Sequence, residues 1–265
     1  MGSDSIDSGS LVLSSVDQGV GVIRLADPGR RNALSPELND RLAAAVAGLL
    51  EADVGAIVLT AEPPVFCAGG SLDGLLKRDT PLDELYRGFL AVAHSPVPTV
   101  AAVGGPVIGA GVNLPLACDV IVTSPSARFD PRFLDVGIHP GGGHLRMLRQ
   151  KIGIQGAAAL VLFGEVLDGH DAVRRGLAWC CVGDSELESV AMDMAVTAAG
   201  RPRELVRRTK ATLLASDSSL AAEDAVALEA SAQRWSMDQP EFRERVQSIR
   251  DSVGRASGNS RPRAR

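Results

Sequence analysis

Aromatic side chains are scarce in this sequence of 265 residues, at 3% of the total. Its hydrophobic fraction of 45% therefore rests mainly on Ala, Val and Leu, and 28 glycines accompany them. With 22% charged residues, the composition is that of an ordinary globular protein. Small apolar side chains and many glycines predict helices and strands that pack closely together.

Other absences exclude whole classes of function. The net charge of −5, with basic residues scattered except in the tail RASGNSRPRAR, argues against a nucleic-acid surface. No apolar run reaches the ~20 residues that a membrane-spanning helix needs. The opening MGSDSIDSGS has no apolar stretch of the kind found in secretory signals, so a cytoplasmic location is expected.

Metal and nucleotide motifs are also missing. The four cysteines show no metal-ligand spacing and are interpreted as reduced, small apolar residues: Cys67, Cys118, Cys180 and Cys181. The stretch GAGVNL lacks the third glycine of a dinucleotide fingerprint, and the GGG at 141–143 has no Lys-Ser/Thr after it. The sequence therefore predicts neither a metal site nor a bound cofactor.

The chain up to about residue 200 has the pattern of an α/β core. Two β-rich stretches flank Asp17-Gln18-Gly19, which indicates a hairpin. Ser35 and Pro36 then have the types preferred at the N-cap and first position of a helix. Continuous apolar runs predict buried strands in VGAIVLTAE, PTVAAVGGPVIGAG and DVIVTSPSARFD.

Helices are expected between and after these strands. The core is predicted to have them near residues 81–93, 110–117 and 144–152. From Glu186 onward the strand pattern disappears and helical periodicity dominates. We divide the chain into a flexible N-terminus (1–10), a core (11–200), a helical region (201–254) and a flexible basic tail (255–265).

Three glycine-marked segments could supply chemistry: VFCAGGSLDGL, VIGAGVNLPLACD and DVGIHPGGGHLRML. The first two each follow an apolar strand, turn on glycine and lead into a helix. Such a turn leaves backbone N–H groups near a helix N-terminus without intrahelical partners. Two of these N–H groups that converge on one point would stabilise an oxyanion, such as a thioester carbonyl becoming an enolate.

Several motifs in a fixed order resemble those of the crotonase, or enoyl-CoA hydratase/isomerase, superfamily, from about residue 11 to about residue 250. DPGRRNALSPEL is similar to the family's Pro-x-x-x-Asn-Ala-Leu segment, and FCAGGSLDGL to its F-x-A-G-x-D/S-L loop. IGAGVNLPLACDVIV matches the G-x-G-x-x-L-x-x-x-C-D helix. ARFDPRFLDVGIHPGGG matches the A-x-F…G-x-x-P-G-x-G segment. The order and separation of the four motifs make the resemblance specific.

The resemblance implies a spiral of repeated ββα units, with C-terminal helices that assemble subunits into a homotrimer or a dimer of trimers. It also implies an acyl-CoA thioester as the partner, so that CoA is part of the substrate. Carried over by position, the oxyanion donors are the backbone N–H groups of Gly70 and Ala110. The CoA contacts implied in the same way are Ala33 and Ala68 near the adenine and Arg30 and Arg31 near the phosphates.

The sequence departs from the hydratases of this family at two positions. One of their glutamates lies on the active-site helix and another follows the A-x-F segment, and the matching residues here are Asn113 and Phe133. Both are kept as substrate-contacting candidates. Hydration needs groups that exchange protons near neutral pH, which an amide and a phenyl ring do not. The two-glutamate mechanism is therefore not expected.

Three other residues are candidate proton carriers, in the order His139, Asp135, His144. The two histidines flank the Gly141–Gly143 turn, and imidazole titrates near neutrality. Two functions follow. The first is an enoyl-CoA hydratase/isomerase homologue that stabilises a thioester enolate in a backbone oxyanion hole. The alternative is a non-catalytic acyl-CoA-binding or regulatory protein on the same fold.

Overall fold

The computed structural model describes residues 11–71, 76, 80–216 and 220–258 of the chain. The chain divides into two units, Met1–Arg201 and Pro202–Arg265. The expectations of a flexible N-terminus and a flexible tail fall partly on residues outside the described ones, namely 1–10 and 259–265.

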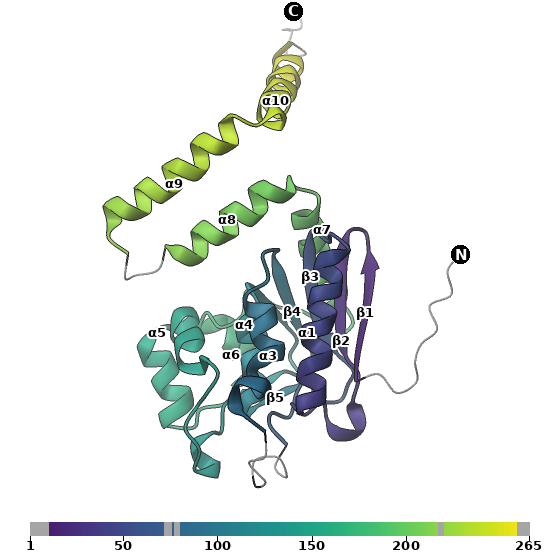
Figure 1. The fold of residues 1–265 in the computed structure, drawn as a ribbon, viewed down its shortest axis with the longest axis vertical. Coiled ribbons are helices and arrows are strands. Elements are labelled where there is room, and N and C mark those ends of the chain that lie inside the picture. Colours follow the sequence, from purple (N-terminus) through teal and green to yellow (C-terminus); the bar gives the residue numbers. More distant parts are fainter. Residues whose placement is uncertain (1–10, 72–75, 77–79, 217–219, 259–265) are drawn as a thin grey trace, which may run out of the picture. The chain divides into compact units, whose positions relative to one another are not determined.

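The first unit is built on a six-stranded sheet with the order β1-β2-β3-β4-β6-β9 (Figure 1). Its strands are β1 (Val12–Asp17), β2 (Val20–Leu25), β3 (Ala56–Ala61), β4 (Thr99–Val103), β6 (Val120–Thr123) and β9 (Cys180–Cys181). Only the β1–β2 pair is antiparallel. The hairpin expected there is confirmed, because Gln18 and Gly19 both have positive φ (49° and 76°) at its turn.

Side chains alternate between the two faces of this sheet. Ile57 and Leu59 of β3 belong to one buried cluster, whereas Ala56 and Val58 belong to another. The second cluster is covered by α7 (Leu187–Ala199). Both faces are thus buried, which explains why the strand sequences are continuously apolar.

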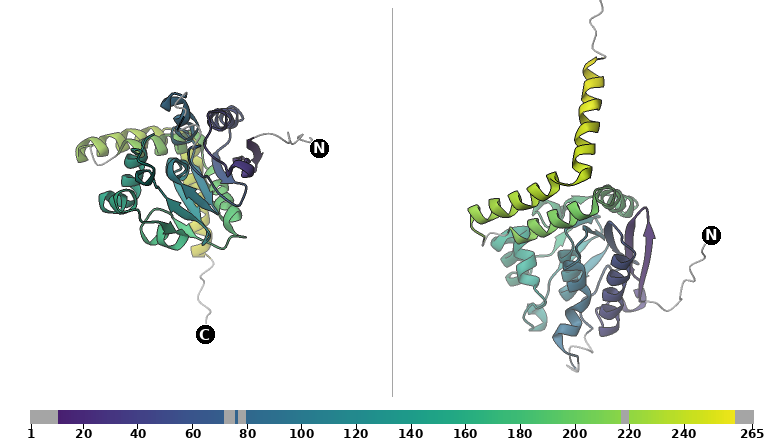
Figure 2. Two further views of the ribbon diagram at one scale, coloured as in Figure 1. Left: turned by 90° about the horizontal axis from the view of Figure 1, so that it is seen from below. Right: turned by 45° about the horizontal axis from the view of Figure 1, so that its top comes forward.

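Two helices lie side by side over the other face, α1 (Pro36–Glu51) and α3 (Leu82–Ala93) (Figures 1 and 2). The N-cap expected for α1 is confirmed, since the Ser35 hydroxyl accepts a hydrogen bond from Leu38 N (3.1 Å). Further helical segments of this unit are η1 (Pro28–Arg30), η2 (Gly109–Val112), α4 (Asn113–Ala117), η3 (Leu134–Val136), α5 (His144–Leu162) and α6 (Gly169–Arg174).

A second, three-stranded sheet has the order β5-β7-β8. Its strands are β5 (Pro106–Ile108), β7 (Arg128–Asp130) and β8 (Leu167–Asp168). The sequence assigned a single strand to DVIVTSPSARFD, but Pro125 lies in a break there and the segment contributes β6 and β7 to different sheets. Likewise α5 extends beyond residue 152, with a kink where Gly153 has φ 70° and ψ 176°.

The second unit consists of α8 (Arg203–Ala215), α9 (Ala222–Met237) and α10 (Pro240–Gly258) in its described residues. The Arg208 guanidinium lies over the Trp235 ring, 4.0 Å from its centroid, which packs α8 against α9. Helix α10 includes residues 255–258, which the sequence assigned to the tail. As expected from Glu186 onward, the described residues after β9 form no strand.

Candidate active site

Two glycine turns lie against each other at the ends of the parallel strands. Residue 67 bridges to residue 107, and Ile108 N donates to Cys67 O (2.9 Å). A Cβ added to Gly69 would lie 2.4 Å from Ile108 O and 3.3 Å from Ala110 N. Gly69 also has φ +85°, in the left-handed region. Both its conformation and its surroundings therefore require glycine.

The turns leave two backbone donors available. Leu34 N donates to Gly69 O (2.8 Å), which fixes the loop without using the N–H of Gly70. Ala110 lies in the first turn of η2, where N–H groups have no intrahelical acceptor. Within the described part of the chain, neither Gly70 N–H nor Ala110 N–H donates a hydrogen bond. These are the two donors expected from the sequence.

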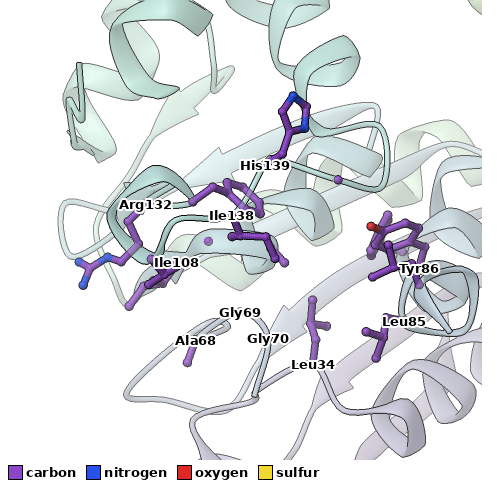
Figure 3. A pocket seen from close by; sticks show the side chains of 17 residues that line it. Leu34, Ala68, Gly69, Gly70, Leu85, Tyr86, Ile108, Arg132, Ile138 and His139 are labelled. Atoms are coloured by element: carbon purple, nitrogen blue, oxygen red, sulfur yellow. The ribbon is translucent and has the colours of Figure 1, made fainter. Parts of the chain in front are cut away.

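Both donors line one pocket of about 160 Å³. Figure 3 shows it between the glycine turns, the 132–139 segment and α3. Most of its lining is apolar. The remaining lining residues are Leu34, Ala68, Gly69, Leu82, Leu85, Tyr86, Phe89, Ile108, Gly109, Arg132, Phe133, Val136, Ile138, His139 and Gly141.

Asn113, which the family resemblance matches to one hydratase glutamate, does not line the pocket. It is 1% exposed, and its Nδ2 donates to Gly141 O (3.1 Å) while its Oδ1 lies 2.7 Å from His144 Nδ1. Phe133, which the resemblance matches to the other glutamate, lines the pocket and meets the His144 ring edge-on at 4.9 Å between centroids. His144 thus contacts both Asn113 and Phe133.

The hydrogen bonds define the state of His144. Because Asn113 uses Nδ2 as the donor to Gly141, its Oδ1 accepts, and the His144 proton lies on Nδ1. Burial lowers the pKa of His144 from 6.5 to about 4, so the ring is neutral at pH 7. Its Nε2 is buried and has no hydrogen-bond partner among the described residues. Asn113, Phe133 and His144 are called the amide–imidazole cluster below.

The other two expected proton carriers lie elsewhere. His139 lines the pocket, but its Nδ1 is 2.7 Å from Pro140 O and its ring points away from the other lining residues (Figure 3). Asp135 faces a different pocket, together with Leu134. The 3₁₀ helix η3 explains why these residues separate. Side chains three residues apart share a face, and Phe133 and Val136 lie on the face that lines the first pocket.

The residues expected to contact CoA lie on adjacent segments. Ala68 N donates to Arg31 O (3.0 Å) and Ala33 N donates to Arg30 O (3.1 Å), so these two N–H groups are already used. Arg30 is paired with Asp27 (2.8 Å), whereas no described side chain pairs with the exposed Arg31. The segment therefore offers backbone carbonyls and one unpaired guanidinium at the protein surface.

Cys67 is part of the packing between the turns. Its thiol is fully buried, donates to Asn32 O (3.0 Å) and has its pKa raised by burial to about 12. A thiol of this kind is inert at neutral pH. This agrees with its interpretation as a small core residue.

Sequence reasoning missed the contribution of α3. Leu82, Leu85, Tyr86 and Phe89 all line the pocket. Their spacing of three and four residues marks one helical face. That signal was present in the sequence, but it does not distinguish a pocket wall from core.

Two classes of feature are missing from the described residues. They contain no group of three or more His, Cys, Asp or Glu side chains arranged to hold a metal ion. They also contain no helix with the length and apolar character needed to cross a membrane.

The chain is thus an α/β protein in which two adjacent glycine turns form one side of an apolar pocket. Residues 15–251 match the family model Enoyl-CoA hydratase/isomerase. A protein named probable enoyl-CoA hydratase EchA14, from Mycobacterium tuberculosis, is 42% identical over 246 residues, which cover 89% of this chain and 95% of the relative. The chain belongs to the enoyl-CoA hydratase/isomerase family, and the crotonase fold expected from its motifs is confirmed.

Solved structures agree with this assignment. An enoyl-CoA hydratase from Polaromonas sp. JS666 has a TM-score of 0.84 at 26% identity, with 91% of this chain and 97% of that chain covered. A hydratase-like protein from Thermobifida fusca YX, solved in complex with CoA, has a TM-score of 0.78 at 26% identity and covers 86% and 93% of the two chains.

Proposed function

We propose that this protein binds an acyl-CoA thioester with its carbonyl oxygen between the N–H groups of Gly70 and Ala110, and that these donors stabilise the thioester enolate. The observation that carries the proposal is that both available donors line one apolar pocket. Preorganised backbone donors in such a pocket stabilise developing negative charge more strongly than water does. Family membership and the CoA complex of the Thermobifida relative support the choice of ligand.

The CoA end is proposed to lie along residues 30–33 and Ala68. Since the N–H groups of Ala33 and Ala68 are used, their carbonyls would accept hydrogen bonds from the adenine amino group. The unpaired Arg31 is the better phosphate partner, because Arg30 is held by Asp27. We expect Arg31→Ala to weaken CoA-ester binding about tenfold, with reduced salt dependence, and Arg30→Ala to weaken it less.

Standard hydration is not part of the proposal. Neither Asn113 nor Phe133 carries a group that titrates near neutral pH, and the Asn113 amide is hydrogen bonded to Gly141 and His144. We expect calorimetry to detect binding of crotonyl-CoA, and a coupled hydration assay to detect no turnover at the level of a strong hydratase. Rapid hydration would contradict the assignment of Asn113 and Phe133.

His139 is the proposed proton carrier for enolate chemistry, because it lines the pocket and neither Asp135 nor His144 does. Its exposed ring must turn about its side-chain bonds to reach a bound acyl group. In D₂O, an acyl-CoA should then exchange its α-protons for deuterium, as measured by mass spectrometry. His139→Ala should abolish this exchange and leave the dissociation constant unchanged within about twofold.

Binding without catalysis is the second candidate. The observation that favours it is that the polar groups of Asn113 and His144 are directed to each other and that the His139 ring points away from the pocket. This candidate predicts tight acyl-CoA binding with no deuterium exchange in the wild-type protein. Exchange that depends on His139 would contradict it.

Assembly into a homotrimer, or a dimer of trimers, is proposed as well. Exposed apolar side chains on the helices of the second unit support an intersubunit surface, among them Leu213, Val226 and Ile249. Light scattering coupled to gel filtration should give three or six times the mass of the 27.6 kDa chain. A monomer at micromolar concentration would contradict this.

A further inference from the structure

Tyr86 is the one tyrosine in the chain, and it lies in the pocket. Three lining residues carry protic side chains: Tyr86, Arg132 and His139. Figure 3 shows the Tyr86 hydroxyl directed toward the interior, whereas the Arg132 guanidinium and the His139 ring point outward. Arg132 Nε is bonded to Asp130 (3.0 Å). Tyr86 therefore presents the polar side-chain atom that faces a bound acyl group.

Its surroundings leave the hydroxyl without a protein partner. The ring packs against Phe89 with 5.6 Å between centroids. Across the described residues, no group exchanges a hydrogen bond with the Tyr86 hydroxyl. The Tyr86 side chain is half-buried in a pocket lined mostly by apolar side chains, so its hydroxyl depends on water or a ligand to complete its hydrogen bonding.

Gly141 creates the space for this hydroxyl. A Cβ added to Gly141 would lie 2.3 Å from the Tyr86 oxygen and 3.2 Å from its Cζ. The Gly141 backbone is itself held, because its carbonyl accepts from Asn113 Nδ2 (3.1 Å). The hydroxyl thus occupies the volume that a side chain at position 141 would fill.

We propose that Tyr86 determines specificity by hydrogen bonding to an oxygen atom on the acyl chain, so that the pocket prefers oxygenated acyl groups to plain hydrocarbon ones. This rests on the proposed binding of acyl-CoA thioesters. A phenolic hydroxyl both donates and accepts, so a hydroxyl or a carbonyl oxygen on the chain satisfies it. A saturated chain would bury the hydroxyl without a partner.

The test compares three CoA esters of one chain length, hexanoyl-, 3-hydroxyhexanoyl- and 6-hydroxyhexanoyl-CoA. Their dissociation constants are measured by calorimetry for the wild-type protein and for Tyr86→Phe, which keeps the ring. We expect at least one hydroxylated ester to bind the wild type more tightly than hexanoyl-CoA. Tyr86→Phe should weaken that ester about tenfold and change hexanoyl-CoA by less than twofold.

A second variant moves the hydroxyl without removing it. Gly141→Ala places a methyl group against the Tyr86 oxygen and should abolish the same preference. Added to Tyr86→Phe, it should have no further effect on the preference. Gly48→Ala is the control, because a Cβ on this α1 glycine meets no atom within 4 Å.

The outcomes separate the two claims. If Tyr86→Phe weakens all three esters equally, or none of them, the specificity assignment is overturned while acyl-CoA binding stands. If the wild-type protein binds none of the esters, the proposed function fails and the assignment of Tyr86 fails with it.

Discussion

The glycine turns and the amide–imidazole cluster meet at one pocket, which the cluster reaches only through Phe133, and they are built in opposite ways. At the turns, Gly69 has no room for a Cβ, and the two available donors are backbone N–H groups. In the cluster, side chains fill the space and the polar atoms of Asn113 bond to Gly141 and His144. Oxyanion stabilisation needs only backbone donors, whereas proton transfer needs a side chain with a free, titrating group.

The largest effect should come from disturbing the turns. Gly69→Ala forces an L side chain into a left-handed conformation and against Ile108 O. We expect a loss of about 3 kcal/mol in the free energy of unfolding and at least a tenfold loss of acyl-CoA affinity. Denaturant unfolding and calorimetry measure the two.

Gly137→Ala is the matched control for that variant. Gly137 also has a left-handed backbone (φ 70°, ψ 26°), but an added Cβ would meet nothing within 4 Å. It should cost only the conformational penalty, about 1–2 kcal/mol. Equal losses of affinity in the two variants would show that contact with Ile108 is unimportant.

The cluster should make stability depend on pH. His144 has a pKa of about 4 in the folded protein, below its ordinary value of 6.5, so the unfolded chain binds more protons between these values. The stabilisation of the folded state that comes from neutral His144 is therefore complete above pH 6.5. About 3 kcal/mol of it is lost as the pH falls toward 4. His144→Phe should flatten this part of the stability profile, measured by urea unfolding from pH 4 to pH 7.5. An unchanged slope would mean that His144 is accessible to solvent.

A smaller change should follow from opening the wall of the cluster. Phe133→Leu removes part of the ring that covers His144. With less desolvation, the pKa of His144 should rise from about 4 toward 6.5, which NMR titration of labelled histidine can follow. Phe129→Leu, at the buried position of strand β7, is the control and should leave that pKa in place.

The smallest effect is expected from changes at Cys67, whose side chain packs between the two glycine turns. Because the Cys67 thiol is buried with its pKa raised to about 12, iodoacetamide at pH 8 should not modify it in the native protein. Mass spectrometry after unfolding should show full alkylation. Cys67→Ser should keep acyl-CoA affinity within about twofold. Rapid native alkylation would indicate that the turns open.

Local patterns were enough to predict much of the fold and the turns. The β1–β2 hairpin, the Ser35 cap and the two glycine segments each follow from a few neighbouring residues. The strands β8 and β9 were missed, because two residues are too short to show periodicity. Helix α5 was expected near residues 144–152, but it continues past the kink at Gly153 to Leu162.

The rest of the site depends on contacts between residues that are far apart in the sequence. His144 meets Asn113 and Phe133 only after folding, and nothing in their spacing indicates that Asn113 would hold the imidazole. From the sequence, Tyr86 is only one residue of an amphipathic helix. Its closeness to Gly141 is visible only in the folded structure. Asp135 was separated from the pocket by the three-residue period of η3.

The proposed contact between a thioester carbonyl and the Gly70 and Ala110 N–H groups can be observed in the infrared stretching band of an acyl-CoA labelled with ¹³C at that carbonyl. If the Gly70 and Ala110 N–H groups bond to the carbonyl oxygen, the band should move to lower frequency on binding to the wild-type protein. Gly69→Ala, at concentrations that saturate it, should lose most of this shift, and Gly137→Ala should keep it. A bound ester whose carbonyl band does not move would contradict the account.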